Sequence, residues 1–194
     1  MNYPNGILKN NNNLITHSNR GMSLEEDLNQ TNDYYLKNDI AIIHKKPTAI
    51  TIKKVDYKKN DMICEAYFKT PSTTDYNGIY KGYYIDFEAK ETRNKTSFPL
   101  ANIHKHQIEH IRKVIVQKGI AFLIVRFVLL NETFVLMGSD LLNFIESTNR
   151  KSIPKSYFEL YGYKVELKYN PRLDYIGIIS NIIKDKEVDN NEGC

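Results

Sequence analysis

The most informative segment of this chain is Asp75-Tyr-Asn-Gly-Ile-Tyr-Lys-Gly-Tyr-Tyr-Ile-Asp-Phe-Glu88-Ala-Lys90. Its second half alternates polar and apolar residues, which predicts a β-strand that ends near Thr92. Successive side chains of a strand point to opposite faces, so one face collects the polar residues Tyr84, Asp86, Glu88 and Lys90. The other face is apolar and is expected to pack on the core. Charged side chains on a strand are costly to bury unless they are paired, so we expect a divalent metal and a phosphate to pair with the charges of this polar face.

Two carboxylates and an ammonium group are the functional groups that metal-dependent hydrolysis of a phosphodiester uses. That reaction needs an activated water, a Lewis acid and a cation near the transition state. Mg²⁺ or Mn²⁺ prefers hard oxygen ligands, and Asp75 and Glu88 suit that role. Lys90 shares the strand face of Glu88 and would lie beside the metal. Spacing alone leaves an alternative open, in which Asp86, Glu88 and Lys90 form an exposed ion-pair ladder of little energetic value.

The bulk properties favour a single cytoplasmic domain. The chain has 194 residues, enough for one substantial core. Lys and Arg exceed Asp and Glu only by 27 to 23, so the net charge is a weak argument for an anionic partner. Six lysines between residues 44 and 59 nevertheless predict a basic working face. Two distant cysteines favour a reducing compartment, and no apolar run is long enough for a membrane helix, so we expect no membrane partner.

The chain is predicted to have an arm, a domain and a tail. Residues 1–21 are rich in asparagine and are expected to be flexible until they meet a partner. Residues 22–184 form the domain, which begins with a helix that has a capping box of Ser23 and Glu26 and extends to about Lys37. The acidic segment 185–194 is predicted to be a flexible tail, to which we assign no role.

Further elements follow from periodicity. Strands are predicted at 40–44, 49–57, 62–69, 120–130 and 134–137, and helices at 102–118, 139–147 and 173–183. The strands 49–57 and 62–69 would form a hairpin with a lysine-rich tip. Asn77-Gly78 is interpreted as a turn, and Gly119 as the C′ residue of the helix before it. The order of the strand that carries Glu88, the helix 102–118 and the strand 120–130 predicts an α/β fold with a mixed central sheet flanked by helices.

Five blocks of the chain resemble a known family: Gly21-Met-Ser-Leu-Glu-Glu-Asp-Leu-Asn29, Ile43-His-Lys-Lys-Pro-Thr48, Ser72-Thr-Thr-Asp-Tyr-Asn-Gly-Ile-Tyr-Lys-Gly82, Ile85-Asp-Phe-Glu-Ala-Lys-Glu-Thr92 and Asn94-Lys-Thr-Ser-Phe-Pro-Leu100. The likeness covers about residues 3–183 and is to RecU, the Holliday junction resolvases within the PD-(D/E)xK nuclease superfamily. It implies a restriction-endonuclease-like core and a homodimer that resolves four-way DNA junctions by paired symmetric nicks with Mg²⁺ or Mn²⁺, which we expect to leave 5′-phosphates. It also implies work with recombinase and branch-migration proteins in recombination and DNA repair.

The resemblance also implies roles for individual residues. Thr73, Asp75, Glu88 and Gln107 would form the metal site, and Lys90 would stabilise the transition state. Without the resemblance, Thr73 is an ordinary turn hydroxyl and Gln107 an ordinary helix position. The residue before Asp75 is threonine where the superfamily label has proline, a departure that RecU shares. Related nuclease folds place an acid on their first helix, which makes Glu25 a candidate extra acid.

The hairpin, about residues 49–70, would be the stalk that this family inserts into the junction. Its lysines would contact phosphates, and Tyr67 and Phe68 would stack on exposed bases. Strand alternation by itself favours one of these two rings buried and the other exposed. The candidate DNA-binding residues are Lys53, Lys54, Lys58, Lys59, Tyr67 and Phe68, together with Arg20 of the arm.

Three other interpretations remain open. A non-catalytic module that binds branched DNA and modulates recombinase would keep every activity after Asp75→Ala or Glu88→Ala. A repair or restriction nuclease on the same fold would cut linear duplex as readily as junctions. A transition-metal site could use His104, His106 and His110, the last two spaced i, i+4 on a helix. No cysteine accompanies them, so histidines beside a DNA groove are the preferred interpretation.

Overall fold

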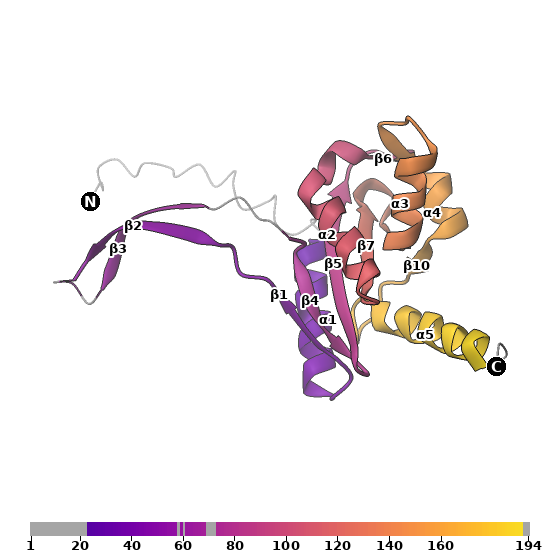
Figure 1. Cartoon of the computed structure of the whole chain (residues 1–194), viewed down its shortest axis with the longest axis horizontal. Helices are drawn as coiled ribbons and strands as arrows, with labels where there is room; N and C mark the ends of the chain where they lie inside the picture. The colour runs from indigo at the N-terminus through magenta and orange to yellow at the C-terminus, as the bar shows by residue number, and fades with distance from the viewer. Residues whose placement is uncertain (1–22, 58, 60, 69–72, 192–194) are drawn as a thin grey trace, which may run out of the picture.

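The computed structural model describes residues 23–57, 59, 61–68 and 73–191. Their largest sheet is mixed and has the strand order β1-β4-β5-β7-β8-β10 (Figure 1). Its strands are β1 (Ile42–Lys45), β4 (Tyr76–Tyr80), β5 (Tyr83–Thr92), β7 (Ile120–Phe127), β8 (Glu132–Met137) and β10 (Tyr163–Val165). The central pair β5–β7 is parallel, whereas β1–β4, β4–β5, β7–β8 and β8–β10 are antiparallel. The predicted α/β class with a mixed central sheet is confirmed.

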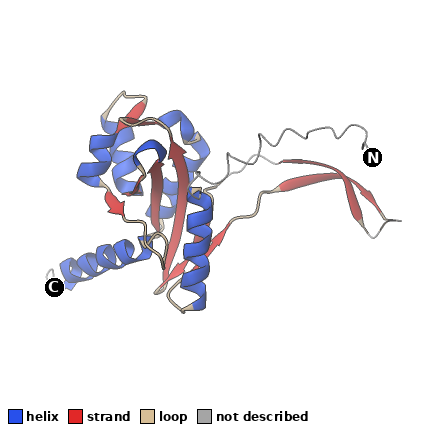
Figure 2. Ribbon diagram, turned by 180° about the vertical axis from the view of Figure 1, so that it is seen from behind, coloured by secondary structure: helices blue, strands red, loops and turns tan. Residues whose placement is uncertain are grey.

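Helices cover both faces of this sheet (Figure 2). They are α1 (Leu24–Lys37), α2 (Lys105–Val116), α3 (Gly138–Ser147), α4 (Lys155–Tyr161) and α5 (Tyr175–Asn191), with 3-10 turns η1 (Leu100–Asn102) and η2 (Val128–Leu130). Side chains of α1 and α5 join one apolar cluster, and those of α2, α3 and α4 join a second. A short antiparallel pair, β6 (Ser97–Pro99) with β9 (Ser152–Pro154), lies outside the main sheet.

Strand β7 explains the long apolar run of the sequence. All of its residues are buried, because the sheet is covered on both faces. Phe122 and Ile124 belong to the cluster on the α1 and α5 face, whereas Leu123 and Val125 belong to the cluster on the other face. The run predicted as one strand to residue 130 ends at Phe127, after which η2 leads into β8.

The predicted hairpin is present and projects from the domain (Figure 1). Its strands β2 (Ile50–Asp56) and β3 (Met62–Phe68) pair only with each other in a two-stranded antiparallel sheet. Every residue of β3 is exposed, as is most of β2. A two-stranded ribbon without a core is marginally stable alone, so its apolar side chains are available to a partner.

The interpretation of Asn77-Gly78 as a turn is wrong. Both residues lie inside β4, which pairs with β1 on one side and β5 on the other. Glycine is required at 78 because of close backbone approach: a Cβ there would lie 1.9 Å from the carbonyl oxygen of Ile42. The chain turns instead at Lys81 and Gly82, whose φ angles of 48° and 83° are those of a tight hairpin turn between β4 and β5.

The helix termini also differ in part from expectation. The capping box of Ser23 and Glu26 is confirmed. Helix α2 begins at Lys105, because the residues before it form η1. At the end of α2, Lys118 occupies the left-handed C′ position with φ 65°. Gly119, the predicted C′ residue, is therefore the next residue of the cap, C″. The N–H groups of Lys118 and Gly119 each donate at 2.9 Å to carbonyl oxygens of the last turn, as in a Schellman motif.

Helix α5 is longer than predicted. It begins at Tyr175 and continues to Asn191, past the expected end at Ile183 and into the segment predicted to be a tail. No helix in the described part of the chain has the length and apolar character needed to cross a membrane.

Candidate active site

The polar face of β5 is buried. Asp86 and Glu88 have no exposed surface, and Lys90 at the end of the strand is partly exposed. Helix α2 packs on this face, where Nε2 of His110 lies 3.2 Å from Oδ2 of Asp86. The exposed ion-pair ladder is therefore excluded, and these charges need buried partners.

Strand register brings Asp75 to Glu88. In the antiparallel pair β4–β5, Tyr76 lies opposite Phe87, and the same register one step earlier sets Asp75 against Glu88. The backbone N–H of Asp75 donates to Oε2 of Glu88 at 3.1 Å. Two acids that are thirteen positions apart in the chain thus meet because a tight turn lies midway between them.

Glu88 is an electrostatically strained carboxyl group. Burial and, to a smaller extent, the neighbouring Asp75 raise its pKa to about 7, with Lys90 opposing the rise. Nζ of Lys90 lies 2.5 Å from Oε1 of Glu88. Lys90 is the partner of this buried oxygen, which has no second donor among the described residues and so keeps capacity for a further contact.

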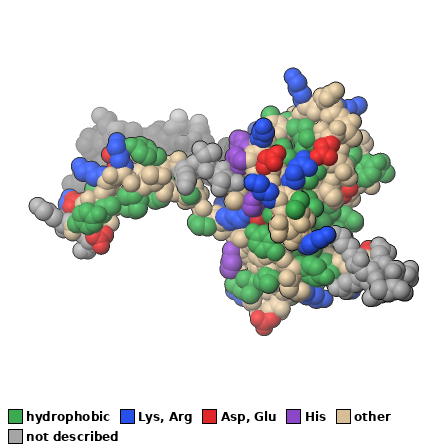
Figure 3. All heavy atoms as spheres, viewed as in Figure 1, with side chains coloured by type: hydrophobic (Ala, Val, Ile, Leu, Met, Phe, Trp, Pro, Cys, Tyr) green, Lys and Arg blue, Asp and Glu red, His purple; other side chains and the backbone are tan. Residues whose placement is uncertain are grey.

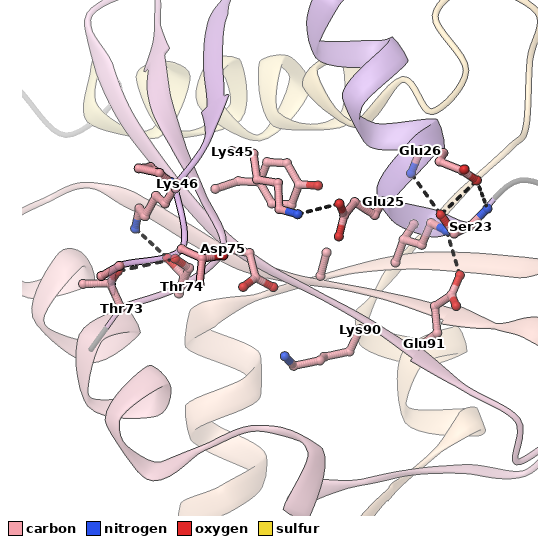
Figure 4. A pocket seen from close by; sticks show the side chains of 16 residues that line it. Ser23, Glu25, Glu26, Lys45, Lys46, Thr73, Thr74, Asp75, Lys90 and Glu91 are labelled. Atoms are coloured by element: carbon pink, nitrogen blue, oxygen red, sulfur yellow. Dashed lines mark hydrogen bonds and ion pairs between the residues drawn. The ribbon is translucent and has the colours of Figure 1, made fainter. Parts of the chain in front are cut away.

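A pocket of about 780 Å³ opens beside this pair. It is lined by the start of α1, the segment after β1, the loop before β4 and the end of β5. Figure 4 shows Asp75 and Lys90 directed into the same space, with Glu25 on the α1 side. Glu25 forms an ion pair with Lys45 at 2.5 Å. The candidate extra acid therefore lines the pocket.

Thr73 and Gln107 occupy different surroundings. Thr73 lines the pocket next to Asp75. Gln107 is buried on α2, where its Oε1 accepts a hydrogen bond of 2.9 Å from the backbone N–H of His104 and so caps the helix. The structure thus brings Thr73, Asp75, Glu88 and Lys90 together, while the hydrogen bond of Gln107 is directed to its own helix.

These residues fit a hard divalent cation. The donors are carboxylate and hydroxyl oxygens, which Mg²⁺ and Mn²⁺ prefer, and such ions keep several waters rather than fill a protein cage. Oε1 of Glu88 is a buried oxygen whose partner is Lys90, and a divalent cation would share it. A cation between two carboxyl groups would also reverse the raised pKa of Glu88, because it favours the charged form.

The three histidines of the alternative metal site do not converge. The rings of His104 and His106 stack with centroids 5.3 Å apart, whereas His110 contacts the buried Asp86. Among the described residues, no group of three or more histidine, cysteine, aspartate or glutamate side chains is arranged to hold a metal ion. A transition-metal centre of the zinc type is not supported.

The hairpin presents its candidate DNA-binding residues to solvent. Phe68 is 83% exposed and Tyr67 50%, so the expectation that one ring is buried is wrong. Nζ of Lys53 lies 3.0 Å from Oε1 of Glu65 and 5.4 Å from the centre of the Tyr67 ring. Lys54 and Lys59 are exposed, and Lys58 and Arg20 lie outside the described residues. Figure 3 shows histidine and basic side chains on the side of the domain nearest the hairpin.

Sequence reasoning missed a network around Asp86. Its partners are Lys46, Thr74, Tyr84 and His110. The signal that could have found it was its position two residues before Glu88 on the same strand face. Tyr84 lies two residues before Asp86 on the same strand, but Lys46, Thr74 and His110 come from distant segments that no local pattern connects.

Comparisons with known proteins identify the family of this chain. Residues 19–181 match the family described as RecU, "Recombination protein U". A "Holliday junction resolvase RecU" of Geobacillus kaustophilus is 55% identical over 171 residues, 86% of each chain. Proteins of the same name are 56% identical in Geobacillus sp. (strain WCH70), over 86% of this chain and 85% of that one, and 54% identical in Bacillus cereus (strain G9842), over 86% of each. With a match over most of its length and relatives that share more than half of the aligned residues, this chain belongs to the RecU family.

Proposed function

We propose that this protein is a metal-dependent endonuclease that resolves four-way DNA junctions in recombination and repair. The observation that carries the proposal is that the buried Glu88 contacts both Asp75 and Lys90, which line one pocket. This pocket lies at the base of the hairpin, since the segments 45–49 and 73–76 that line it lead into and out of β2 and β3. The relatives named as Holliday junction resolvases support the same activity.

The chemistry follows from the charges of the site. Mg²⁺, with Mn²⁺ as a substitute, would supply a Lewis acid and an activated water when bound. Asp75 and Glu88 would hold the cation, with Thr73 beside them and Gln107 as the fourth predicted ligand. Lys90 would place its ammonium group next to the phosphate and stabilise the charge that develops on the phosphoryl oxygens. An in-line attack by water would leave 5′-phosphate ends.

We propose that the hairpin gives the enzyme its preference for four-way junctions over linear duplex DNA. The domain would be a restriction-endonuclease-like core with a stalk, and the stalk would enter the open centre of a junction. Exposed Phe68 and Tyr67 offer stacking surfaces to unpaired bases, and the lysines of the stalk offer charge to phosphates. A linear duplex has no such opening, so the stalk would favour junctions.

Paired nicks require two sites. We propose a homodimer, because a two-fold assembly places identical sites on matching strands of a junction that has the same symmetry. Contacts with recombinase and branch-migration proteins are part of the same proposal and rest on family membership.

Cys64 is a free cysteine, which supports a reducing compartment such as the cytoplasm.

The test is cleavage of a synthetic mobile four-way junction and a matched linear duplex with Mg²⁺. Wild type is expected to cut the junction preferentially, and Glu88→Ala to bind the junction without cutting it. Glu166→Ala, at a site whose side chain is 71% exposed, serves as the control and is expected to cut normally. Unchanged cutting by Glu88→Ala would refute the site, and equal cutting of the linear duplex would favour a repair or restriction nuclease.

A further inference from the structure

We propose that Asp86 is a positioning residue that holds the loop 73–75 in place for metal binding; this inference rests on the metal site proposed above. Asp86 is completely buried, yet it carries a carboxylate that pairs with a lysine. A buried carboxylate is costly unless several groups satisfy it, and its partners reveal what it organises.

The two oxygens of Asp86 collect donors from four parts of the fold. Oδ1 accepts a hydrogen bond from the hydroxyl of Thr74. Oδ2 lies 2.8 Å from Nζ of Lys46, which follows β1, and accepts from the hydroxyl of Tyr84 at 2.9 Å. Nε2 of His110, on α2, lies 3.2 Å from the same oxygen. Asp86 thus ties the loop before β4, the end of β1 and helix α2 to the catalytic strand.

Thr74 is the link from this network to the chemistry. It stands between Thr73 and Asp75, and its hydroxyl contacts both Asp86 and Nζ of Lys46, the latter at 2.9 Å. The loop has a second tether one residue later, where the N–H of Asp75 donates to Glu88. Two adjacent residues are therefore fastened to the two buried acids of β5, and this arrangement sets the direction of the Thr73 and Asp75 side chains.

The number of hydrogen-bond and ion-pair partners distinguishes the roles of Asp86 and Glu88. Glu88 has one partner on each oxygen: Oε1 lies 2.5 Å from Nζ of Lys90, and Oε2 accepts from the N–H of Asp75. Asp86, in contrast, has four partners, Thr74 on Oδ1 and Lys46, Tyr84 and His110 on Oδ2. A carboxylate committed in this way orients its neighbours rather than binding a metal itself. Removing such supporting partners typically weakens metal affinity by about 10–100-fold.

The experiment is a calorimetric titration of the full chain with Mn²⁺ in the absence of DNA, on Thr74→Val and Asp86→Asn. Both variants are expected to bind Mn²⁺ at least about tenfold more weakly than wild type. Thr74→Ser, which keeps the hydroxyl, is expected to restore the affinity. Junction binding by Thr74→Val without metal is expected to match wild type, because the loop hydroxyl is not a DNA contact.

Thr31→Val is the matched control. Thr31 is a fully buried threonine on α1 whose hydroxyl accepts a hydrogen bond from the N–H of Leu173 at 2.9 Å, away from the pocket. It is expected to bind Mn²⁺ as wild type does. Equal weakening in this control would mean that general loosening accounts for the effect and would overturn the positioning role.

The remaining outcomes separate the inference from the function on which it rests. If Glu88→Ala loses Mn²⁺ binding but Thr74→Val retains full affinity, the positioning role is overturned and the metal site stands. Loss of binding in Asp86→Asn alone would make Asp86 a ligand and would also overturn it. If wild type binds no Mn²⁺, the metal site and this inference fail together. Should circular dichroism show Asp86→Asn unfolded, Thr74→Val decides.

Discussion

Replacing Glu88 by glutamine should stabilise the metal-free protein while it abolishes cutting. Burial, with the neighbouring Asp75, raises the pKa of Glu88 from an ordinary 4.5 to about 7. An acid with a raised pKa in the folded state favours folding in its protonated form. Its ionisation therefore costs stability as the pH rises from about 4.5 through 7, and the loss is complete above pH 7.

The magnitude follows from the same two values. At about 1.36 kcal/mol for each pH unit between them, ionised Glu88 costs the native state about 3 kcal/mol at pH 8. Glutamine resembles the protonated acid in shape and charge, so the variant escapes this cost. For a chain of this size the gain corresponds to a Tm higher by roughly 6–12 °C. At pH 4.5 the two proteins should melt within a few degrees of each other.

Metal should remove most of this difference at pH 8. Mn²⁺ at one hundred times its Kd would stabilise wild type by about 2.7 kcal/mol, but would leave the variant nearly unchanged because it lacks the carboxylate. The assay is thermal unfolding followed by circular dichroism at pH 4.5, 6 and 8, with chelator and with Mn²⁺. Glu166→Gln, an exposed substitution, is the control and should shift Tm little at any pH. A Glu88→Gln variant that melts at or below wild type at pH 8 in chelator would refute the account of a strained carboxylate.

Three further predictions concern the scaffold and the stalk. Arg126→Met removes a 2.6 Å partner from the buried Asp27, which keeps Arg172 at 3.0 Å, and should cost about 2 kcal/mol in chemical denaturation, so an unmoved midpoint would contradict it. Gly78→Ala places a Cβ 1.9 Å from the carbonyl oxygen of Ile42 and should separate β1 from β4, seen as faster amide exchange in both strands; native protection there would argue against the close approach. Phe68→Ala changes a ring that is 83% exposed, so it should leave Tm unchanged. It should weaken the cutting of a four-way junction more than the cutting of single-stranded DNA. A fall in Tm would mean that the ring packs on the fold.

Local patterns sufficed for much of the fold. The capping box of Ser23 and Glu26 needs only the spacing of two residues, and it is present. The hairpin of β2 and β3 follows from alternation and a polar tip, and it too is present. Predictions failed where one local signal had two meanings. Asn77-Gly78 has the composition of a turn, but Gly78 serves close strand packing, and the turn residues are Lys81 and Gly82.

The sequence by itself determined the candidate strand and the family, because alternation puts Glu88 and Lys90 on one face and long blocks of residues are distinctive. Thr73 and Gln107 were named only through that resemblance. Tertiary structure decided how Asp75 reaches Glu88, since the register of β4 on β5 depends on a turn that the sequence pattern misplaced. It also decided that the charged face is buried, because helix α2 covers it. Burial gives Glu88 its raised pKa and Asp86 its need for partners, and burial is a property of packing between segments that no local spacing encodes.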